Sequence, residues 1–308
     1  MTAAAPRFSI IIPTHGRPRQ LTRCLESLTR LEASRGGSEA IIVDDASPEP
    51  LHEILAPFAD SLPVRLVVTP KGGPAKARNA GAAQARGEIL AFTDDDCEPE
   101  PAWLRALDHC FRLHPDRLVG GRTRNALSDN VYSEASQQLL DFVYRWQESK
   151  SNGGLRFFAS NNLAVSRLRF EALGGFASDF PFPAAEDRDF CARWIESGGE
   201  LLYAPDARVM HSHEMGLFGF CRQHFTYGRG AWAFHASRAA GGAGSSTQEP
   251  WGFFEGLIWH AMRRSGGLAR GVLFPPLMVV SQTAHAAGYS WEAIQVPYKR
   301  PEVRAGHR

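Results

Sequence analysis

Short apolar runs alternate with segments of helical spacing through the first 125 residues, and this alternation limits the fold more than any other feature. The apolar runs are almost continuous, which predicts strands buried on both faces; they are residues 8–12, 40–43, 64–68 and 89–92. Helical spacing occurs between and after them, in 21–31, 75–85 and 102–113. Strands that alternate with helices predict an α/β fold, in which helices flank a mostly parallel, Rossmann-like sheet.

The rest of the chain predicts a second half of this domain and a helical extension. We expect helices in 124–148 and 187–196, a strand in 157–165, and two short strands in 201–203 and 207–210. Residues 239–250, AAGGAGSSTQEP, have the composition of a flexible linker. We therefore expect a domain over 1–238 with halves 1–125 and 126–238, then the linker, a C-terminal helical extension over 251–296 and a loose tail over 297–308.

Composition and charge exclude some classes of protein. The 308 residues are 44% hydrophobic and 22% charged, which is typical of a chain that folds around a core and not of a disordered one. Lys and Arg number 34, and Asp and Glu number 33, which gives a net charge of +1. Because proteins that bind nucleic acid usually carry a clear basic excess, we expect no nucleic-acid partner.

Cysteine content and hydropathy bear on location. The five cysteines are scattered, odd in number and without a CxxC pair, which is typical of a reducing compartment. The most lipid-like stretch, 271–280, is broken by Pro275 and Pro276 and is much shorter than the ~20 apolar residues of a spanning helix. We expect a cytoplasmic protein whose C-terminal region leaves peripheral contact with a membrane open.

Three consecutive carboxylates, Asp94, Asp95 and Asp96, follow the apolar run 89–92. In parallel α/β sheets, ligands bind outside the carboxyl ends of the strands. Carboxylates this close destabilise one another unless a cation is present, and Mg²⁺ or Mn²⁺ with oxygen ligands compensates them well. A solvated acidic turn is the alternative, but the position at the end of a buried strand favours a metal site.

Two clusters in the first half offer nucleotide-binding chemistry. Asp44 and Asp45 follow the run 40–43, where a carboxylate suits a ribose or a base, although the same residues are good turn formers. Residues 71–79, KGGPAKARN, combine glycines, a helix start and cations, which suits an anion. Neither a Walker A motif nor GxGxxG after a strand is present.

Two clusters in the second half offer a base and metal ligands. Glu186 and Asp187 suit a general base, and equally the acidic first turn of a helix. His211 and His213 lie two positions apart, so that both imidazoles share one face if the segment is a strand. Neutral imidazole is a common metal ligand, whereas a lone histidine is more often structural.

In this order and spacing, the clusters are similar to the motifs of the family 2 glycosyltransferases, inverting enzymes of the GT-A fold. The resemblance covers residues 8–227, and the eighty C-terminal residues have no such match. It depends on SIIIPT (9–14), IVDDAS (42–47), GPAKARNAG (73–81), GEILAFTDDD (87–96), WL (103–104), NNLA (161–164), GGF (174–176), EDRD (186–189) and VMH (209–211). It implies that 1–125 bind the nucleotide and that 126–238 carry the acceptor and catalytic residues.

The resemblance also implies a role for each matched position. The implied donor-binding residues are Pro13, Thr14, Arg17, Asp45 at the base, Lys71 and Arg78 at the pyrophosphate, Asp94 and Asp95. The implied metal ligands are Asp96, Asp94 and His211, with His213 left open as the alternative to His211. The implied catalytic base is Asp187 with Glu186 beside it, and Asn161 and Asn162 are implied to lie near the sugar or the acceptor.

These roles describe a hexosyltransferase with Mn²⁺ or Mg²⁺ as cofactor. It would move a sugar from a nucleoside-diphosphate donor, a UDP-sugar by default, to the hydroxyl of a saccharide, lipid-linked or small-molecule acceptor. One base opposite the leaving group predicts inversion at the anomeric carbon. Three alternatives stay open: a nucleotidyltransferase that forms sugar nucleotides, a non-catalytic nucleotide- or glycan-binding module, and a metal hydrolase built on His211 and His213, which lacks HExxH.

Overall fold

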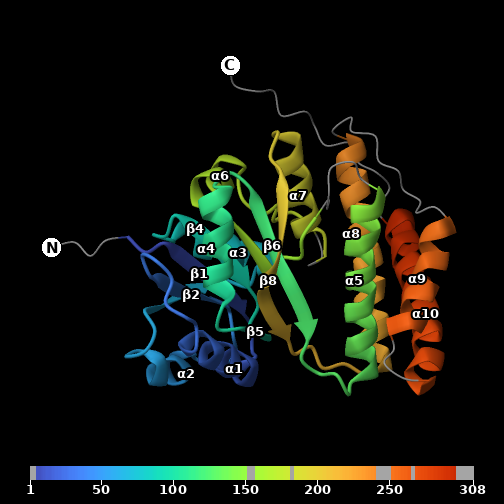
Figure 1. Cartoon of the computed structure of the whole chain (residues 1–308), viewed down its shortest axis with the longest axis horizontal. Helices are drawn as coiled ribbons and strands as arrows, with labels where there is room; N and C mark the ends of the chain where they lie inside the picture. The colour runs from blue at the N-terminus through green and yellow to red at the C-terminus, as the bar shows by residue number, and fades with distance from the viewer. Residues whose placement is uncertain (1–4, 151–156, 181–183, 241–250, 265–267, 296–308) are drawn as a thin grey trace.

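The computed structural model describes residues 5–150, 157–180, 184–240, 251–264 and 268–295. Within them, one eight-stranded sheet has the order β3-β2-β1-β4-β7-β6-β8-β5 (Figure 1). The strands are β1 (Phe8–Thr14), β2 (Ser38–Asp45), β3 (Val64–Thr69), β4 (Ile89–Thr93), β5 (Cys97–Pro99), β6 (Leu118–Asn125), β7 (Asn162–Ser166) and β8 (Leu201–His211).

The sheet is mixed, with its parallel part in the N-terminal half. Strand β1 pairs in parallel with β2 and β4, β2 with β3, and β6 with β8. Strand β7 is antiparallel to β4 and β6, and β5 is antiparallel to β8. The prediction of a mostly parallel α/β sheet is therefore confirmed. The carboxyl ends of β1, β2 and β4 meet at one edge, because these three strands run in the same direction.

Helices cover both faces of the sheet with two separate cores. On one face, α1 (Pro18–Thr29), α2 (His52–Leu55) with the 3-10 turn Ala56–Phe58, and α4 (Trp103–Leu113) pack on β1, β2 and β4. On the other face, α3 (Pro74–Ala83), α6 (Arg167–Ala172) and α7 (Glu186–Glu196) bury a second set of apolar side chains. Helix α3 lies very close to the sheet, because a Cβ on Gly81 would come within 2.8 Å of both Ile11 and Val43.

Four further helices gather beside the sheet (Figure 1): α5 (Val131–Lys150), α8 (Leu217–Ala240), α9 (Trp251–Arg264) and α10 (Leu268–Gln295). They share a third core that includes Phe142, Phe220, Phe253 and Phe274. Helices α8 and α10 approach each other at two glycines. A Cβ on Gly228 or on Gly288 would lie 1.9 Å from a carbonyl oxygen of the other helix.

Several expected elements differ from those observed. Strand β3 is only partly buried, because it is the edge strand beyond β2. The two short strands expected in 201–203 and 207–210 are one strand, β8, whose pairing with β6 shifts register after Gly121. Strand β6 was not expected, and the strand expected in 157–165 starts only at Asn162.

The C-terminal region differs as well. Pro275 and Pro276 lie inside α10, where the neighbouring Phe274, Leu277 and Met278 are buried in the third core and support the helix. Of the expected linker 239–250, the first two residues end α8, and 241–250 lie outside the described residues, as does the expected tail 297–308.

Candidate active site

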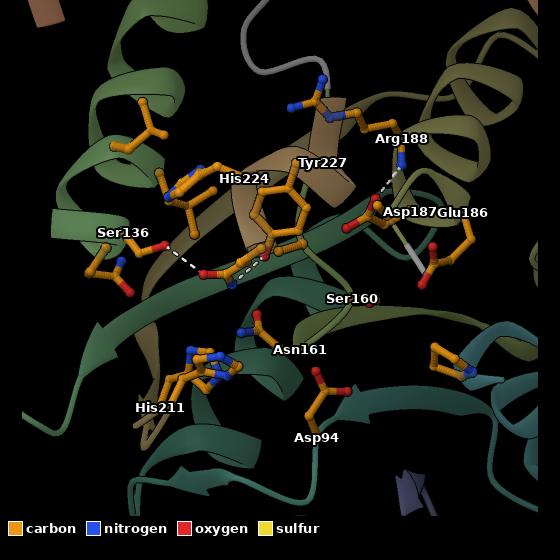
Figure 2. Close-up of a pocket in the computed structure, with 18 of the residues that line it drawn as sticks. Asp94, Ser136, Ser160, Asn161, Glu186, Asp187, Arg188, His211, His224 and Tyr227 are labelled. Carbon is orange, nitrogen blue, oxygen red and sulfur yellow. Dashed lines mark hydrogen bonds between the residues drawn. The ribbon is translucent and has the colours of Figure 1, made fainter. Parts of the chain in front are cut away.

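A cavity of about 730 Å³ opens at the carboxyl ends of β1, β2 and β4 and extends to α5, α7, α8 and α10. Lys71 and Asn162 do not line it. The other expected site residues all do: Pro13, Thr14, Arg17, Asp45, Arg78, Asp94, Asp95, Asp96, Asn161, Glu186, Asp187 and His211. Figure 2 shows several of them, with Asp94 and His211 on the sheet side and Asp187 across the cavity.

The middle carboxylate of the triplet, Asp95, connects two loops. It is buried, accepts a hydrogen bond from Thr14 Oγ1 at 2.7 Å and lies 3.2 Å from Arg17 Nη1. Burial raises the pKa of Asp95 to about 6, although the Arg17 charge and the Thr14 hydrogen bond favour the carboxylate. Asp95 thereby holds the end of β1 against the acidic loop after β4.

The third carboxylate, Asp96, lies between two histidines. Its Oδ1 is 3.3 Å from His211 Nε2 and its Oδ2 is 3.6 Å from His213 Nδ1. The pairing of β5 with β8 places Cys97 opposite His211, which explains why residues 115 positions apart along the chain meet here. Burial acts to raise the pKa of Asp96, but hydrogen bonds from both histidines and the charge of Arg17 outweigh it and hold that pKa far below its usual range.

This group is chemically suited to a divalent ion. Ligand atoms of Asp96, Cys97 and His211 all lie within 4.8 Å of one another. Burial raises the pKa of the Cys97 thiol well above its ordinary value, which leaves the carboxylate and the imidazole as the better ligands. A carboxylate oxygen with imidazole nitrogen fits Mn²⁺, whereas Mg²⁺ prefers oxygen alone.

Arg78 is buried between two carboxylates. Its Nη2 donates to Asp94 Oδ1 at 2.5 Å and its Nη1 to Glu186 Oε1 at 3.2 Å, while its Nε has no hydrogen-bond partner among the described residues. The expectation placed Arg78 against a pyrophosphate. In the structure it lines the cavity but is paired with protein carboxylates, because α7 brings Glu186 to the start of α3.

The residues expected at the base and at the pyrophosphate also have protein partners. Asp45 accepts hydrogen bonds from the backbone N–H groups of Gly72 and Gly73, at 2.7 and 2.9 Å. The next residue, Ala46, has a φ of 61°, a left-handed conformation that is uncommon for a residue with a side chain. Lys71 Nζ lies 3.1 Å from Nε2 of His15, which lines the cavity, although Lys71 itself does not.

Asp187 lies at the start of α7 with its side chain at the cavity wall. Its Oδ1 accepts from the backbone N–H of Arg188 at 2.7 Å. Burial and then the neighbouring Glu186 raise the pKa of Asp187 to about 6, against the opposing charges of Arg188 and Arg78. A carboxylate with a raised pKa facing a cavity has the properties of a general base.

The two adjacent asparagines differ in their surroundings. Asn161 lines the cavity and accepts from Thr123 Oγ1 at 3.2 Å. Asn162 uses both ends of its amide in the core: Oδ1 accepts from Trp103 Nε1 at 2.9 Å, and Nδ2 donates to the carbonyl of Ala207 at 3.0 Å. These bonds indicate that Asn162 holds α4 and β8 on the sheet, so the structure offers no basis for its expected contact with sugar or acceptor.

The sequence left open the role of the residues on one side of the cavity. Helices α5, α8 and α10 contribute side chains that include Ser136, Gln223, His224, Tyr227 and His285. The aromatic and basic character of the segment around α8 was visible in the sequence. The sequence did not show which face of α8 lines the cavity, because apolar residues occur on all sides of this helix instead of forming one stripe.

A mixed sheet with an Asp-x-Asp motif after β4, and a carboxylate facing it from α7, defines a glycosyltransferase of the GT-A type that uses a nucleotide sugar. The family model described as Glycosyl transferase family 2 matches residues 9–168. The chain belongs to glycosyltransferase family 2, as the resemblance in the sequence implied.

Similar proteins include two microbial glycosyltransferases. Glycosyltransferase AglE of Haloferax volcanii is 28% identical over 239 residues, which are 75% of this chain and 74% of that protein. The pre-mycofactocin glycosyltransferase of Mycobacterium tuberculosis is 28% identical over 229 residues, which are 72% of this chain but 46% of the mycobacterial protein.

Two solved structures share the fold. The mannosyltransferase PcManGT of Pyrobaculum calidifontis, in complex with GDP-Man and Mn²⁺, has a TM-score of 0.64 at 19% identity and covers 93% of this chain and 88% of its own. GalNAc-T7 with UDP, GalNAc and Mn²⁺ has a TM-score of 0.55 at 17% identity, with 96% of this chain and 58% of its own covered. The GT-A fold predicted from the sequence is thus confirmed.

Proposed function

We propose that this chain is a metal-dependent, inverting hexosyltransferase that moves a sugar from a nucleoside diphosphate to an acceptor hydroxyl. The observation that carries the proposal is that a single cavity holds the Asp94–Asp96 carboxylates, His211 and Asp187. One end is suited to a diphosphate and a cation, and the other offers a base. Family membership and the Mn²⁺ in the two similar structures support this interpretation.

Asp187 removes the proton of the acceptor hydroxyl as the new glycosidic bond forms. Its raised pKa makes it a stronger base than an exposed carboxylate. Arg17 and Arg78 line the donor end, where they stabilise the negative charge that develops on the departing diphosphate. Attack from the side opposite the leaving group inverts the anomeric carbon.

Asp96 and His211 are the residues that would hold a divalent cation, with Asp94 positioned for the ribose or for the same cation. When bound, such an ion supplies positive charge to the diphosphate. Pro13, Thr14 and Asp45 form the wall for the nucleoside. UDP is our default donor nucleotide, but of the two similar structures one holds UDP and the other GDP-Man.

The C-terminal helices support a further part of the proposal, peripheral contact with a membrane that carries a lipid-linked acceptor. In the described part of the chain, no helix is long and apolar enough to span a bilayer. Several large apolar side chains of α9 and α10 are nevertheless exposed: Trp251, Trp259, Val272, Trp291 and Ile294. Tryptophan is favoured at membrane–water interfaces. The five cysteines are free, which supports the expected cytoplasmic side.

Point variants test the membrane contact better than truncation, because α10 also lines the catalytic cavity. The intact chain should sediment with liposomes, and Trp251→Ser combined with Trp259→Ser should reduce the bound fraction without changing the melting temperature. If the liposomes sediment and the intact chain remains in the supernatant, this part of the proposal is contradicted.

The test of the main proposal is a thermal-shift panel of UDP, GDP, TDP and CMP, each with Mn²⁺ and with EDTA. A ligand at 100 times its Kd stabilises a protein by about 2.7 kcal/mol. We expect one nucleotide to raise the melting temperature only when Mn²⁺ is present. The matching sugar nucleotide should then lose its sugar to an acceptor or slowly to water. Pyrophosphate release from a nucleoside triphosphate would instead indicate the nucleotidyltransferase.

A further inference from the structure

The cavity has two chemically different ends. The end at the sheet is charged, with four carboxylates, those of Asp45 and Asp94–Asp96, and the two arginines Arg17 and Arg78. The end formed by α5, α8 and α10 offers neutral groups that donate and accept hydrogen bonds, next to apolar side chains. We call this second end the helical wall and define it by Ser136, Gln223, His224, Tyr227, His285 and Tyr289.

His224 has an unsatisfied hydrogen-bonding group in this wall. The side chain is only 2% exposed, and its Nε2 has no partner among the described residues. Phe220 and Tyr227 flank the ring, with centroids 4.4 and 5.8 Å away. A buried polar atom without a partner is rare in native proteins and calls for an explanation such as a ligand. Since His224 lines the cavity, a hydroxyl bound there would supply the missing bond.

The imidazole is neutral at physiological pH. Burial, and then the neighbouring His285, lower the pKa of His224 to about 4. Burial first, with Arg188 and His235, likewise lowers the pKa of His285 to about 4. A neutral imidazole has one donor and one acceptor, as a sugar hydroxyl has. At neutral pH neither His224 nor His285 therefore carries a positive charge that would attract a phosphate or a carboxylate.

Tyr227 extends the same pattern toward the base. Its hydroxyl accepts from Gln223 Nε2 at 2.8 Å, and Gln223 Oε1 in turn accepts from Ser136 Oγ at 3.3 Å, which connects α8 to α5 (Figure 2). The Tyr227 side chain is 41% exposed, and the desolvation of its hydroxyl by the surrounding protein raises the pKa of Tyr227 to about 12, so the phenol keeps its proton at neutral pH. That proton is available to a ligand, because the hydrogen bond from Gln223 uses only an oxygen lone pair. Figure 2 shows Tyr227 between His224 and Asp187.

We propose that the helical wall is the acceptor subsite, that it takes a neutral pyranose, and that His224 Nε2 and Tyr227 Oη bind its hydroxyls. Aromatic side chains of the same cavity, among them Phe157 and Phe253, suit the apolar C–H face of such a ring. An anionic sugar is disfavoured, because Arg188 is the single arginine or lysine that the described residues place at this end, and its guanidinium lies over the Phe157 ring, 4.7 Å from the centroid. The inference rests on the proposed function and names its acceptor class.

Saturation-transfer NMR with defined glycosides tests this. The probes are methyl pyranosides of glucose, galactose, mannose and N-acetylglucosamine, with methyl glucuronide and glucose 6-phosphate as anionic counterparts. Each is measured with the nucleotide that binds best and with Mg²⁺, which is diamagnetic and does not broaden the ligand signals as Mn²⁺ would. We expect at least one neutral glycoside to bind at least tenfold more tightly than either anion. An octyl glycoside of the same sugar separates the two sources of that sugar: equal affinity indicates a free glycan, and tighter binding a lipid-linked one.

Variants then assign the contact. His224→Phe keeps an aromatic ring at this position but removes both imidazole nitrogens. Glycoside affinity should therefore fall at least tenfold, while nucleotide affinity stays within twofold. The melting temperature should not fall, because an unsatisfied polar atom is removed, whereas a purely structural histidine would lower it. Tyr227→Phe should weaken the glycoside at least threefold. His109→Phe, an exposed position on α4, is the matched control and should change nothing.

Three outcomes would overturn the inference: no glycoside binds, an anionic sugar binds as well as the neutral ones, or His224→Phe and Tyr227→Phe both keep wild-type affinity. Nucleotide binding is read in the same samples. A protein that binds the nucleotide but no glycoside refutes only the acceptor subsite. A protein that binds glycosides but no nucleotide refutes the proposed transferase and leaves the subsite standing.

Discussion

Arg78 Nη1 lies 3.2 Å from Oε1 of Glu186, a residue 108 positions further along the chain. The same guanidinium donates to Asp94, so one buried cation joins the acidic loop after β4 to the first turn of α7. The proposed donor end and the proposed base are thereby connected through a single side chain. If a diphosphate binds as proposed, it would compete with both carboxylates for Arg78, and Glu186 would then lose a partner beside Asp187.

Replacing Arg78 should cost more stability than replacing an ordinary arginine. Arg78→Met leaves Asp94 and Glu186 without their buried counter-charge, and we expect a loss of about 3–5 kcal/mol in the free energy of unfolding, measured with urea. Nucleotide binding should also be lost. Arg105→Met is the control, because its partner Glu32 is on the surface, and it should change stability by less than about 1 kcal/mol. Equal losses for both variants would contradict a buried bridge.

Asp187→Asn should remove the general base but not the fold. General-base catalysis contributes about 10²–10⁴-fold, so we expect turnover to fall by that factor with an unchanged KM for the donor. Asp189→Asn is the control on the same helix, since Asp189 pairs with Arg193 and does not line the cavity. Near-normal turnover of Asp187→Asn would show that another residue is the base.

The pKa of Asp187 predicts two opposite pH effects. Transfer should rise with pH through about 6, because the base acts when ionised. A carboxyl whose pKa is raised in the folded state loses stabilisation as pH rises from below about 4 to above 6. Asp187→Asn should therefore gain melting temperature over the wild type at pH 8 and lose that advantage at pH 4. A constant difference across this range would contradict the raised pKa.

Removal of the metal ligands should separate metal binding from nucleotide binding. In Asp96→Asn we expect the Mn²⁺-dependent part of the thermal shift with nucleotide to disappear. Glu98→Gln lies two residues along the chain, on β5 and outside the cavity lining, and should keep it. His211→Ala should weaken Mn²⁺ more than His213→Ala, since His211 lies nearer to Asp96. The reverse order in a Mn²⁺ titration would assign the ligand to His213.

Asn162→Ala should lower the free energy of unfolding, and Asn161→Ala should weaken substrate binding. The first leaves Trp103 Nε1 and the Ala207 carbonyl unpaired in the core, which costs about 1–3 kcal/mol for each group. The second removes a cavity-lining amide, so we expect a higher KM with a smaller change in unfolding free energy. If Asn162→Ala is as stable as the wild type but has lost acceptor affinity, the structural role is wrong.

Gly228→Ala should separate α8 from α10. The added Cβ would lie 1.9 Å from the carbonyl oxygen of His285, so the helices must move apart, and overpacking of this kind costs at least about 1–3 kcal/mol. Gly219→Ala lies on the same helix with its nearest neighbour at 3.4 Å, and it should be neutral or stabilise by up to about 1 kcal/mol. Unchanged stability of Gly228→Ala would mean that the two backbones are not in contact.

The sequence predicted correctly those features that depend on residues close together in the chain. The apolar runs of β1, β2 and β4 and the carboxylates directly after them place Asp45 and Asp94–Asp96 at one edge of the sheet, because parallel strands end together. The short edge contact of β5 with β8 was not readable, although it brings His211 to Asp96. Pairing of distant strands depends on register, which no single segment contains.

The sequence by itself determined the class of fold, the family of the enzyme and the acidic cluster at the carboxyl end of β4, since these depend on periodicity and on motifs with fixed spacing along the chain. Only the tertiary structure decided that Arg78 pairs with Glu186, that Asn162 belongs to the core, and that His224 and Tyr227 line the cavity. Each of these follows from how helices and strands more than 40 residues apart in the chain pack against each other. The direction in which a helical side chain points is set by that packing and not by its neighbours in sequence.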